Sequence, residues 1–254
     1  LAIDALEKDW ESYPVFHVDF NGTNFTEAGA LQGIVKGLVE SWEKQYGFQP
    51  NTDYTYGQRF CELLAHVHHT TGKRCVVLID EYDKPLLDVM DTDFKMEMNG
   101  EMRLIEDCNR ETLKGFYSTF KAADAHLQFV LLTGVTKFSQ VSVFSGFNQP
   151  MDISMNRQYD AICGITKDEL ITQLDEPVAN MALALGLDKE EMIERLVKQY
   201  DGYHFSRGMV DMFNPFSVLN ALNEQELRSY WFATGTPTYL IRLLKHNHEN
   251  LNDL

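Results

Sequence analysis

Two adjacent carboxylates, Asp80 and Glu81, directly follow a run of apolar residues at 75–79. A nucleoside triphosphatase needs this arrangement, because the strand end fixes one carboxylate near Mg²⁺ and the next carboxylate can polarise the attacking water. We expect Asp80 to serve the metal and Glu81 to serve the water. The alternative is that Asp80 only caps the turn after a buried strand, as Asp often does in α/β proteins.

A second polar segment follows another apolar run, residues 129–132, and consists of Thr133, Gly134, Val135, Thr136 and Lys137. A threonine hydroxyl at this place could hydrogen-bond the γ-phosphate or the attacking water, and Lys137 would add positive charge. The alternative is an ordinary turn in which Gly134 supplies backbone freedom. Because both polar segments are expected at the same edge of a parallel sheet, together they favour a nucleotide site more strongly than either does alone.

The phosphate-binding part of such a site is missing from the sequence. Residues 1–254 contain no G-x-x-x-x-G-K-[ST] motif, the loop that holds the phosphates in sites of this kind. Thr71, Gly72 and Lys73 do not replace it, because they precede the acidic strand and are typical of a turn that ends a helix. We therefore expect half of an ATPase site, and little or no ATP hydrolysis by this chain alone.

The pattern of apolar residues predicts the elements that position these motifs. Alternation or continuous apolar runs predict three strands, over residues 14–20, 75–79 and 129–132. The last two runs are typical of strands covered on both faces. Helical spacing predicts helices over residues 31–42, 60–67 and 99–125. This order indicates a doubly wound α/β sheet that binds ligands at the carboxyl ends of its strands.

After about residue 164 the pattern becomes mainly helical. Polar caps mark three helix starts, at Thr166 with Glu169, at Asp188 with Glu191, and at Asn214 with Pro215. Residues 203–213 predict a small hairpin, and residues 234–237 predict a turn. We expect an α/β domain over residues 1–160 and a mainly helical domain over residues 161–254.

Composition excludes several classes of protein. With 44% hydrophobic and 24% charged residues, the chain has the composition of a folded globular protein. Its net charge of −16 repels phosphate backbones, so nucleic-acid binding is not indicated. The four cysteines lack close pairs, and no apolar run is long enough to cross a bilayer. We expect a cytoplasmic protein without a membrane segment and, because the chain begins at Leu1, a piece of a longer polypeptide.

Two other chemistries fit the residues less well. His66, His68 and His69 could suggest a metal, but histidines in the last turn of a helix are favoured by the helix dipole, and no zinc-type spacing is present. A nuclease site could combine Asp80 with Asp93 and Lys95. We expect neither, because residues 88–100 are too polar for the strand that such a nuclease triplet occupies.

Several ordered motifs, spread over nearly the whole chain, resemble the bacterial AAA-ATPase-like family of P-loop proteins. They are LEKDWESYPVFHVDF, VVLIDEYDKPLL, FVLLTGVTKFSQVSVFSGFNQPMDIS, YDGYHFS, NPFSVLNAL and YWFATGTPTYLIRLL. The resemblance implies a P-loop NTPase-like parallel sheet, here without its first strand and phosphate loop, which family members carry upstream of the segment matching residues 1–20. It also implies a nuclease domain like those of restriction endonucleases downstream in many members.

The resemblance further implies ATP and Mg²⁺ as cofactors. Asp80 and Glu81 match the Walker B acids of the family, and either Thr133 or Thr136 matches the polar sensor position. No arginine finger can be assigned, and the candidates by charge are Arg157, Arg207 and Arg242.

Two functions therefore stay open. The intact protein is either a Mg²⁺-dependent ATPase or a regulatory, partner-binding module whose nucleotide site is vestigial. A homo-oligomer or a protein partner is compatible with both. In related folds the phosphate-loop strand lies inside the sheet, so we also expect an exposed sheet edge that could pair with another chain.

Overall fold

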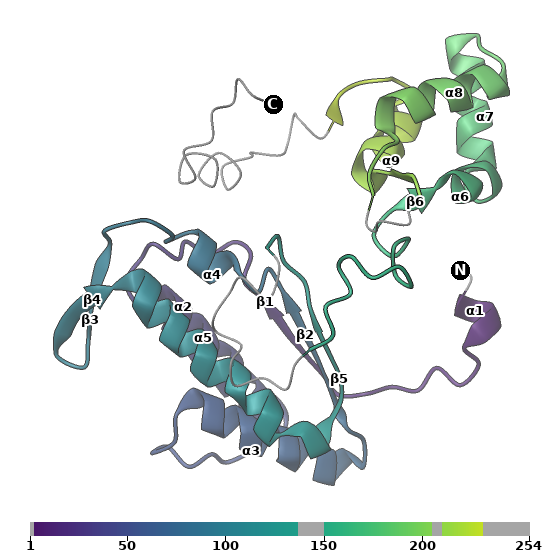
Figure 1. The fold of residues 1–254 in the computed structure, drawn as a ribbon. Coiled ribbons are helices and arrows are strands. Elements are labelled where there is room, and N and C mark those ends of the chain that lie inside the picture. Colours follow the sequence, from purple (N-terminus) through teal and green to yellow (C-terminus); the bar gives the residue numbers. More distant parts are fainter. Residues whose placement is uncertain (1–2, 137–149, 205–209, 231–254) are drawn as a thin grey trace. The chain divides into compact units, whose positions relative to one another are not determined.

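A computed structural model describes residues 3–136, 150–204 and 210–230 of the chain. The chain divides into two compact units, residues 1–150 and 151–254, which Figure 1 colours from purple to green and from green to yellow. The sequence analysis placed this division near residue 160.

The first unit contains a parallel sheet of three strands. They are β1 (Val15–Asp19), β2 (Cys75–Asp80) and β5 (Leu127–Leu132). The strand order is β1-β2-β5, and both neighbouring pairs are parallel. Together with the helical second unit, this confirms the expected α/β class with a parallel sheet.

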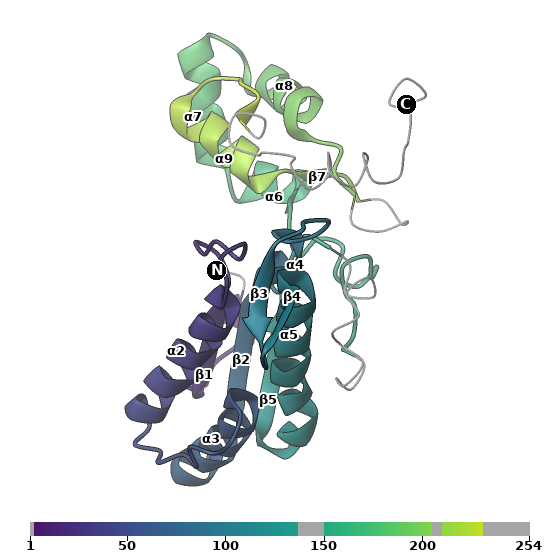
Figure 2. The same cartoon turned by 90° about the vertical axis from the view of Figure 1, so that its left-hand side faces the viewer.

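Three long helices pack on one face of this sheet (Figures 1 and 2). They are α2 (Ala30–Gln45), α3 (Tyr56–Thr71) and α5 (Ile105–Ala122). Helix α3 begins at a capping box made by Thr55 and Gln58, and Gly72 ends it in the left-handed conformation. The described part of this unit also contains the short helices α1 (Ile3–Leu6) and α4 (Lys84–Leu87) and a 3₁₀ turn, η1 (Asp124–His126).

An aromatic cluster joins the helices to the sheet. The ring of Phe60 lies 5.2–6.4 Å, between centroids, from four others, those of Phe16, Trp42, Phe116 and Phe120. Phe16 and Phe60 are fully buried, so β1, α2, α3 and α5 share one core. This core fixes which face of each strand points inward.

The opposite face of the sheet is bare in the described part of the chain. Its side chains Val15, Phe129 and Leu131 are 47%, 53% and 36% exposed. The expectation that residues 75–79 and 129–132 form strands covered on both faces is therefore wrong for the described residues. Apolar residues stand on both faces, as the pattern indicated, but helices cover only one. Strand β5 also pairs with β2 alone, so one of its edges is open within the described segments.

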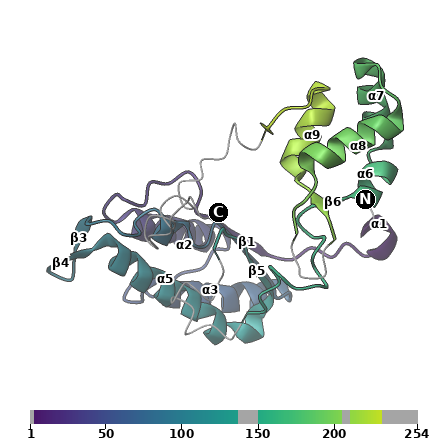
Figure 3. The same ribbon diagram turned by 45° about the horizontal axis from the view of Figure 1, so that its top comes forward.

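The predicted helix over residues 99–125 is wrong at its start. Residues 95–104 form a hairpin of β3 (Lys95–Met98) and β4 (Glu101–Leu104), and α5 begins only at Ile105. The turn is Asn99-Gly100, with φ values of 56° and 85°, which is the two-residue turn most favoured in hairpins. The same finding corrects the expectation that residues 88–100 contain no strand. The hairpin extends past the start of α5 and is separate from the sheet that carries Asp80 (Figure 3).

The second unit consists mainly of helices around a separate core. Its elements are β6 (Ile165–Thr166), α6 (Lys167–Thr172), α7 (Asp175–Leu185), α8 (Lys189–Tyr200), β7 (Met212–Phe213) and α9 (Pro215–Glu224). All three predicted helix starts are confirmed, because the side chains of Thr166, Asp188 and Asn214 each accept a hydrogen bond from the first turn. The predicted hairpin over residues 203–213 is described only in part. An antiparallel bridge joins Tyr203 and Met212, and residues 205–209 lie outside the described residues. The predicted turn at residues 234–237 lies outside the described residues.

No helix in the described part of the chain is long and apolar enough to cross a membrane. The four cysteines are free thiols, two of them, Cys75 and Cys108, buried.

The aromatic cluster generates a stability prediction. Replacing Phe60 by Ala should lower the free energy of unfolding of the first unit by about 3–5 kcal/mol, because the side chain is fully buried among four rings. The matched control is Phe129→Ala on the bare face, which should cost less than about 1 kcal/mol. Urea unfolding followed by the fluorescence of Trp42, in a background with Trp10→Phe and Trp231→Phe, measures both. Equal losses would contradict the described packing.

Candidate functional site

The carboxyl ends of β2 and β5 lie side by side and bring their polar residues into contact. Ile79 is level with Leu132, and the Thr133 backbone N–H donates to the Ile79 carbonyl over 2.9 Å. The Thr133 hydroxyl donates to Oδ1 of Asp80, which also accepts from the Glu81 N–H at 3.1 Å. The two polar segments singled out in the sequence, 53 residues apart, thus meet at one edge of the sheet.

Glu81 has an unusual backbone and an unusual electrostatic environment. Its φ of 55° lies in the left-handed region, which costs energy for a residue with a Cβ. Partial burial and then the carboxylates of Asp83 and Asp80 raise the pKa of its carboxyl, while Lys84 opposes the rise. A carboxylate with a raised pKa accepts a proton more readily than a free one, so Glu81 is suited to act as a base.

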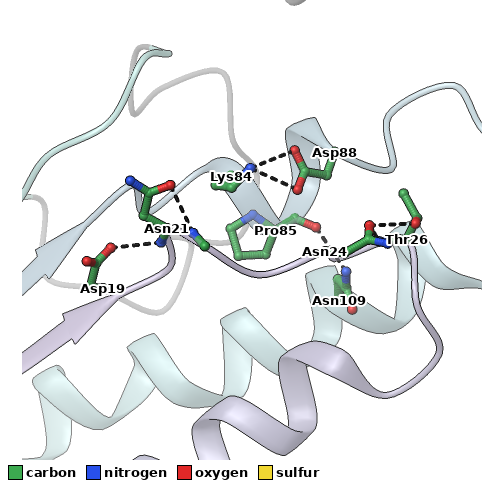
Figure 4. A network of polar contacts seen from close by, with 9 residues as sticks. Asp19, Asn21, Asn24, Thr26, Lys84, Pro85, Asp88 and Asn109 are labelled. Atoms are coloured by element: carbon green, nitrogen blue, oxygen red, sulfur yellow. Dashed lines mark hydrogen bonds and ion pairs between the residues drawn. The ribbon is translucent and has the colours of Figure 1, made fainter.

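A third strand end adds another carboxylate that the sequence analysis did not single out. Asp19 closes β1 and is level with Asp80 in the parallel pairing. Its Oδ1 accepts from the Asn21 N–H at 2.7 Å, and this turn is drawn in Figure 4. Asp19 stands at the end of a predicted strand, and this position could have marked it in the sequence as a candidate site residue. Its side chain concentrates negative charge at this edge and contributes to the raised pKa of Glu81.

The structure also brings in Tyr82 and Asp83, which follow the two acids. Asp83 is fully buried. Its Oδ2 accepts hydrogen bonds from the Thr136 N–H at 2.6 Å and from the Thr136 hydroxyl at 2.5 Å. Of the two candidate threonines, Thr133 therefore faces Asp80, whereas the hydroxyl of Thr136 is engaged by Asp83. Nothing in the local sequence distinguished them.

Helix α5 supports this edge from within the core. The buried Tyr117 hydroxyl donates to the Tyr82 carbonyl at 3.2 Å, and the amide of Asn109 donates to the Pro85 carbonyl at 2.9 Å. Pro85 belongs to the short helix α4 (Lys84–Leu87), whose Lys84 pairs with Asp88 at 3.0 Å. Figure 4 shows the contact of Asn109 with Pro85 and the ion pair of Lys84 with Asp88. The turn after β2 is thus held from one side by two buried side chains of α5.

A shallow hollow lies beside the site on the bare face of the sheet. It encloses about 210 Å³ and is lined by His17, Leu78, Ile79, Asp80, Leu131 and Thr133. Sites for drug-sized ligands usually enclose 300–1,000 Å³. The hollow is therefore too small to enclose a nucleoside triphosphate with these residues alone.

The donor set fits Mg²⁺ held jointly with phosphates. In the described residues no group of three or more His, Cys, Asp or Glu side chains could hold a metal ion by itself. Mg²⁺ usually takes one or two protein carboxylates and completes its shell with water and substrate phosphates. Asp80, with Asp19 and Glu81 beside it, offers such a partial set and an excess of negative charge that a cation would offset.

The histidines lie elsewhere in the first unit. His68 and His126 approach each other with 3.0 Å between their Nδ1 atoms, and His66 contacts the Tyr46 carbonyl. Partial burial, and then the neighbouring His68 and His69, lower the pKa of His126. These histidines therefore contact one another and the backbone, and they lie apart from the polar strand ends.

Four candidate positive charges remain to be placed. Lys137, Arg207 and Arg242 lie outside the described residues. Arg157 is described and belongs to the second unit.

Comparison with known proteins gives one family and one relative. The family model described as predicted AAA-ATPase matches residues 1–144. An uncharacterized protein in the vnfD 5′ region of Azotobacter chroococcum mcd 1 is 38% identical over 237 residues. The match covers 93% of this chain and 42% of that protein, so the chain spans less than half of the relative's length. No solved structure matches the chain.

The raised pKa of Glu81 predicts a pH-dependent stability effect. Because the folded chain favours protonated Glu81, ionisation lowers its stability as the pH rises above the usual value of 4.5. Replacing Glu81 by Gln should therefore stabilise the chain at pH 7, by less than about 1 kcal/mol since the group is partly solvated.

The gain should disappear near pH 4, where wild-type Glu81 is protonated. Thermal unfolding between pH 4 and pH 8 measures the difference, with Glu97→Gln, an exposed position on β3, as the matched control. A gain that is the same at every pH would show that charge is not its cause.

Proposed function

Because the chain belongs to the predicted AAA-ATPase family, we propose that it supplies the magnesium-binding and water-activating half of an ATPase site. The observation that carries this proposal is the contact between Thr133 and Asp80, which joins the polar ends of two neighbouring parallel strands. Phosphoryl transfer depends on positioned charges of this kind more than on covalent chemistry by the protein.

Each acid has a separate role in this proposal. Asp80 binds Mg²⁺, directly or through a water molecule, and Asp19 adds negative charge next to it. The bound ion offsets the charge that develops on the phosphates. Glu81 orients the attacking water and takes its proton while the water oxygen bonds the γ-phosphorus and the bond to the ADP oxygen breaks. The acids around Glu81 and its partial burial support this role by raising its pKa.

The residues after β5 complete the polar edge. The Thr133 hydroxyl, which donates its proton to Asp80 here, accepts a hydrogen bond from the attacking water, or donates to the γ-phosphate once Asp80 binds the cation. Thr136 anchors the segment through Asp83. Lys137, the next residue in the sequence, supplies a positive charge for the nucleotide in this proposal.

We further propose that a phosphate-binding loop outside residues 1–254 completes the site. The open edge of β5 and the exposed Phe129 and Leu131 offer a place for one more strand and a covering helix. The small volume of the hollow and the greater length of the relative support a missing segment. ATP binding then requires that segment, because its backbone N–H groups and lysine hold the β- and γ-phosphates.

The second candidate is a regulatory or partner-binding module with a vestigial site. The absence of a G-x-x-x-x-G-K-[ST] motif from residues 1–254 favours it. The bare sheet face and the open edge of β5 would then bind a second copy of the chain or another protein.

The first test uses the protein extended upstream of Leu1 in its own reading frame, which we call the extended protein. Replacing Glu81 by Gln should lower kcat for Mg²⁺-dependent ATP hydrolysis by about 10²–10⁴-fold, because the base is lost. The Kd for ATP should change little, since Gln keeps the size of the side chain. Glu97→Gln is the control. Unchanged turnover in Glu81→Gln would refute the role of Glu81, and no ATP binding by the wild type would favour the second candidate.

The second test uses residues 1–254 alone. Phosphate release should stay at the background rate at millimolar Mg-ATP, because the chain lacks a loop to hold the phosphates. Turnover that the Glu81→Gln variant abolishes would contradict the missing-loop proposal while supporting the assignment of Glu81.

A further inference from the structure

Asp83 has a buried carboxylate that does not cap the helix that Asp83 precedes. It stands at the N-cap of α4, where an Asp side chain normally accepts a hydrogen bond from the first turn. Here the backbone carbonyl accepts from the Leu86 and Leu87 N–H groups, while the side chain makes no capping bond. The carboxylate is directed instead at the segment after β5.

The hydrogen bonds to that segment replace the water that Asp83 loses on burial. Thr136 donates both its N–H and its hydroxyl to Oδ2, and the Val135 N–H approaches Oδ1 at a longer 3.4 Å. Bonds to a charged acceptor are about twice as strong as neutral ones, and a buried carboxylate without them would be costly. The adjacent cation, Lys84, pairs with Asp88. The buried Asp83 side chain thus depends on Thr136 for its short hydrogen bonds.

The fit between the two segments is tight. A Cβ on Gly134 would lie 2.6 Å from Oδ1 of Asp83 and 2.7 Å from Cε1 of Tyr82, closer than real Cβ contacts. The Tyr82 N–H donates to the Thr133 carbonyl at 3.0 Å, and its hydroxyl donates to the Thr136 carbonyl. Residues 133–136 are therefore held at both ends by Tyr82 and Asp83.

We propose that Asp83 is a positioning residue that sets the Thr133 hydroxyl against Asp80. Among the described residues, no hydrogen bond joins the Asp83 side chain to Asp80 or Glu81. Asp83 acts through Thr136 and the segment 133–136. The inference rests on the proposed function, because the geometry that it sets is that of the ATPase site.

The first readout is independent of activity and uses the chain of residues 1–254. In Asp83→Asn, the amides of Val135 and Thr136 should exchange with deuterium about 10-fold faster or more, because Asn has one acceptor oxygen and no charge. The control Asp88→Asn removes a neighbouring carboxylate that binds Lys84 and should leave both amides unchanged. Thr136→Val keeps the backbone donor, so it should raise the exchange rates less than Asp83→Asn does. It is the variant to use if Asp83→Asn does not fold.

The second readout is turnover by the extended protein. Asp83→Asn and Thr133→Val should each lower kcat about 10-fold or more with little change in the KM for ATP. The double variant should be no slower than the slower single variant, because both changes disable the same hydroxyl. A purely structural role would instead give losses that multiply.

The outcomes separate the two proposals. If the wild type hydrolyses ATP but Asp83→Asn does not slow it, or if the losses multiply, the positioning role is overturned and the ATPase remains. Unchanged amide exchange in both Asp83→Asn and Thr136→Val overturns it without reference to activity. If the wild type does not hydrolyse ATP, the proposed function fails and the positioning role fails with it, whatever the exchange rates.

Discussion

The parallel register of β2 between its two neighbours is the constraint on which the site depends. It places Asp19, Asp80 and the residues after Leu132 level with one another at one edge of the sheet. A shift of one residue would turn Phe16 and Val77 out of the core and move every strand end. The aromatic cluster around Phe60 therefore protects the geometry of the polar edge, although no ring of the cluster touches it.

Several features that usually cost stability come together at this edge. Glu81 has a left-handed backbone, several carboxylates lie close together, and Asp83 is buried with hydrogen-bond donors as its compensation. Such features cost stability and persist where the surrounding structure holds them. Here Tyr117 and Asn109 of α5 hold the turn, and the turn holds residues 133–136. A cation bound at Asp80 would relieve the repulsion, which gives the cluster a chemical purpose.

Sequence patterns were sufficient where one local signal decides the structure. The three strands of the parallel sheet, the helices α2 and α3, and the caps at Thr166, Asp188 and Asn214 all follow from periodicity and capping chemistry. The hairpin at Asn99-Gly100 was missed although its turn signal is local, because the helical spacing of the residues after it was extended back over residues 99–104. The bare face and the bond between Asp83 and Thr136 were not accessible, since each depends on contacts between segments far apart in the chain. Choosing Thr133 over Thr136 needed those contacts as well.

The central claim is that Asp80 and the residues around it bind the magnesium of an ATPase site. The most direct measurement is an electron paramagnetic resonance titration of Mn²⁺, as a substitute for Mg²⁺, into the extended protein with a non-hydrolysable ATP analogue. The account predicts one nucleotide-dependent Mn²⁺ per chain, lost or much weakened in Asp80→Asn and kept in Asp88→Asn. Equal Mn²⁺ binding by the wild type and Asp80→Asn would contradict it.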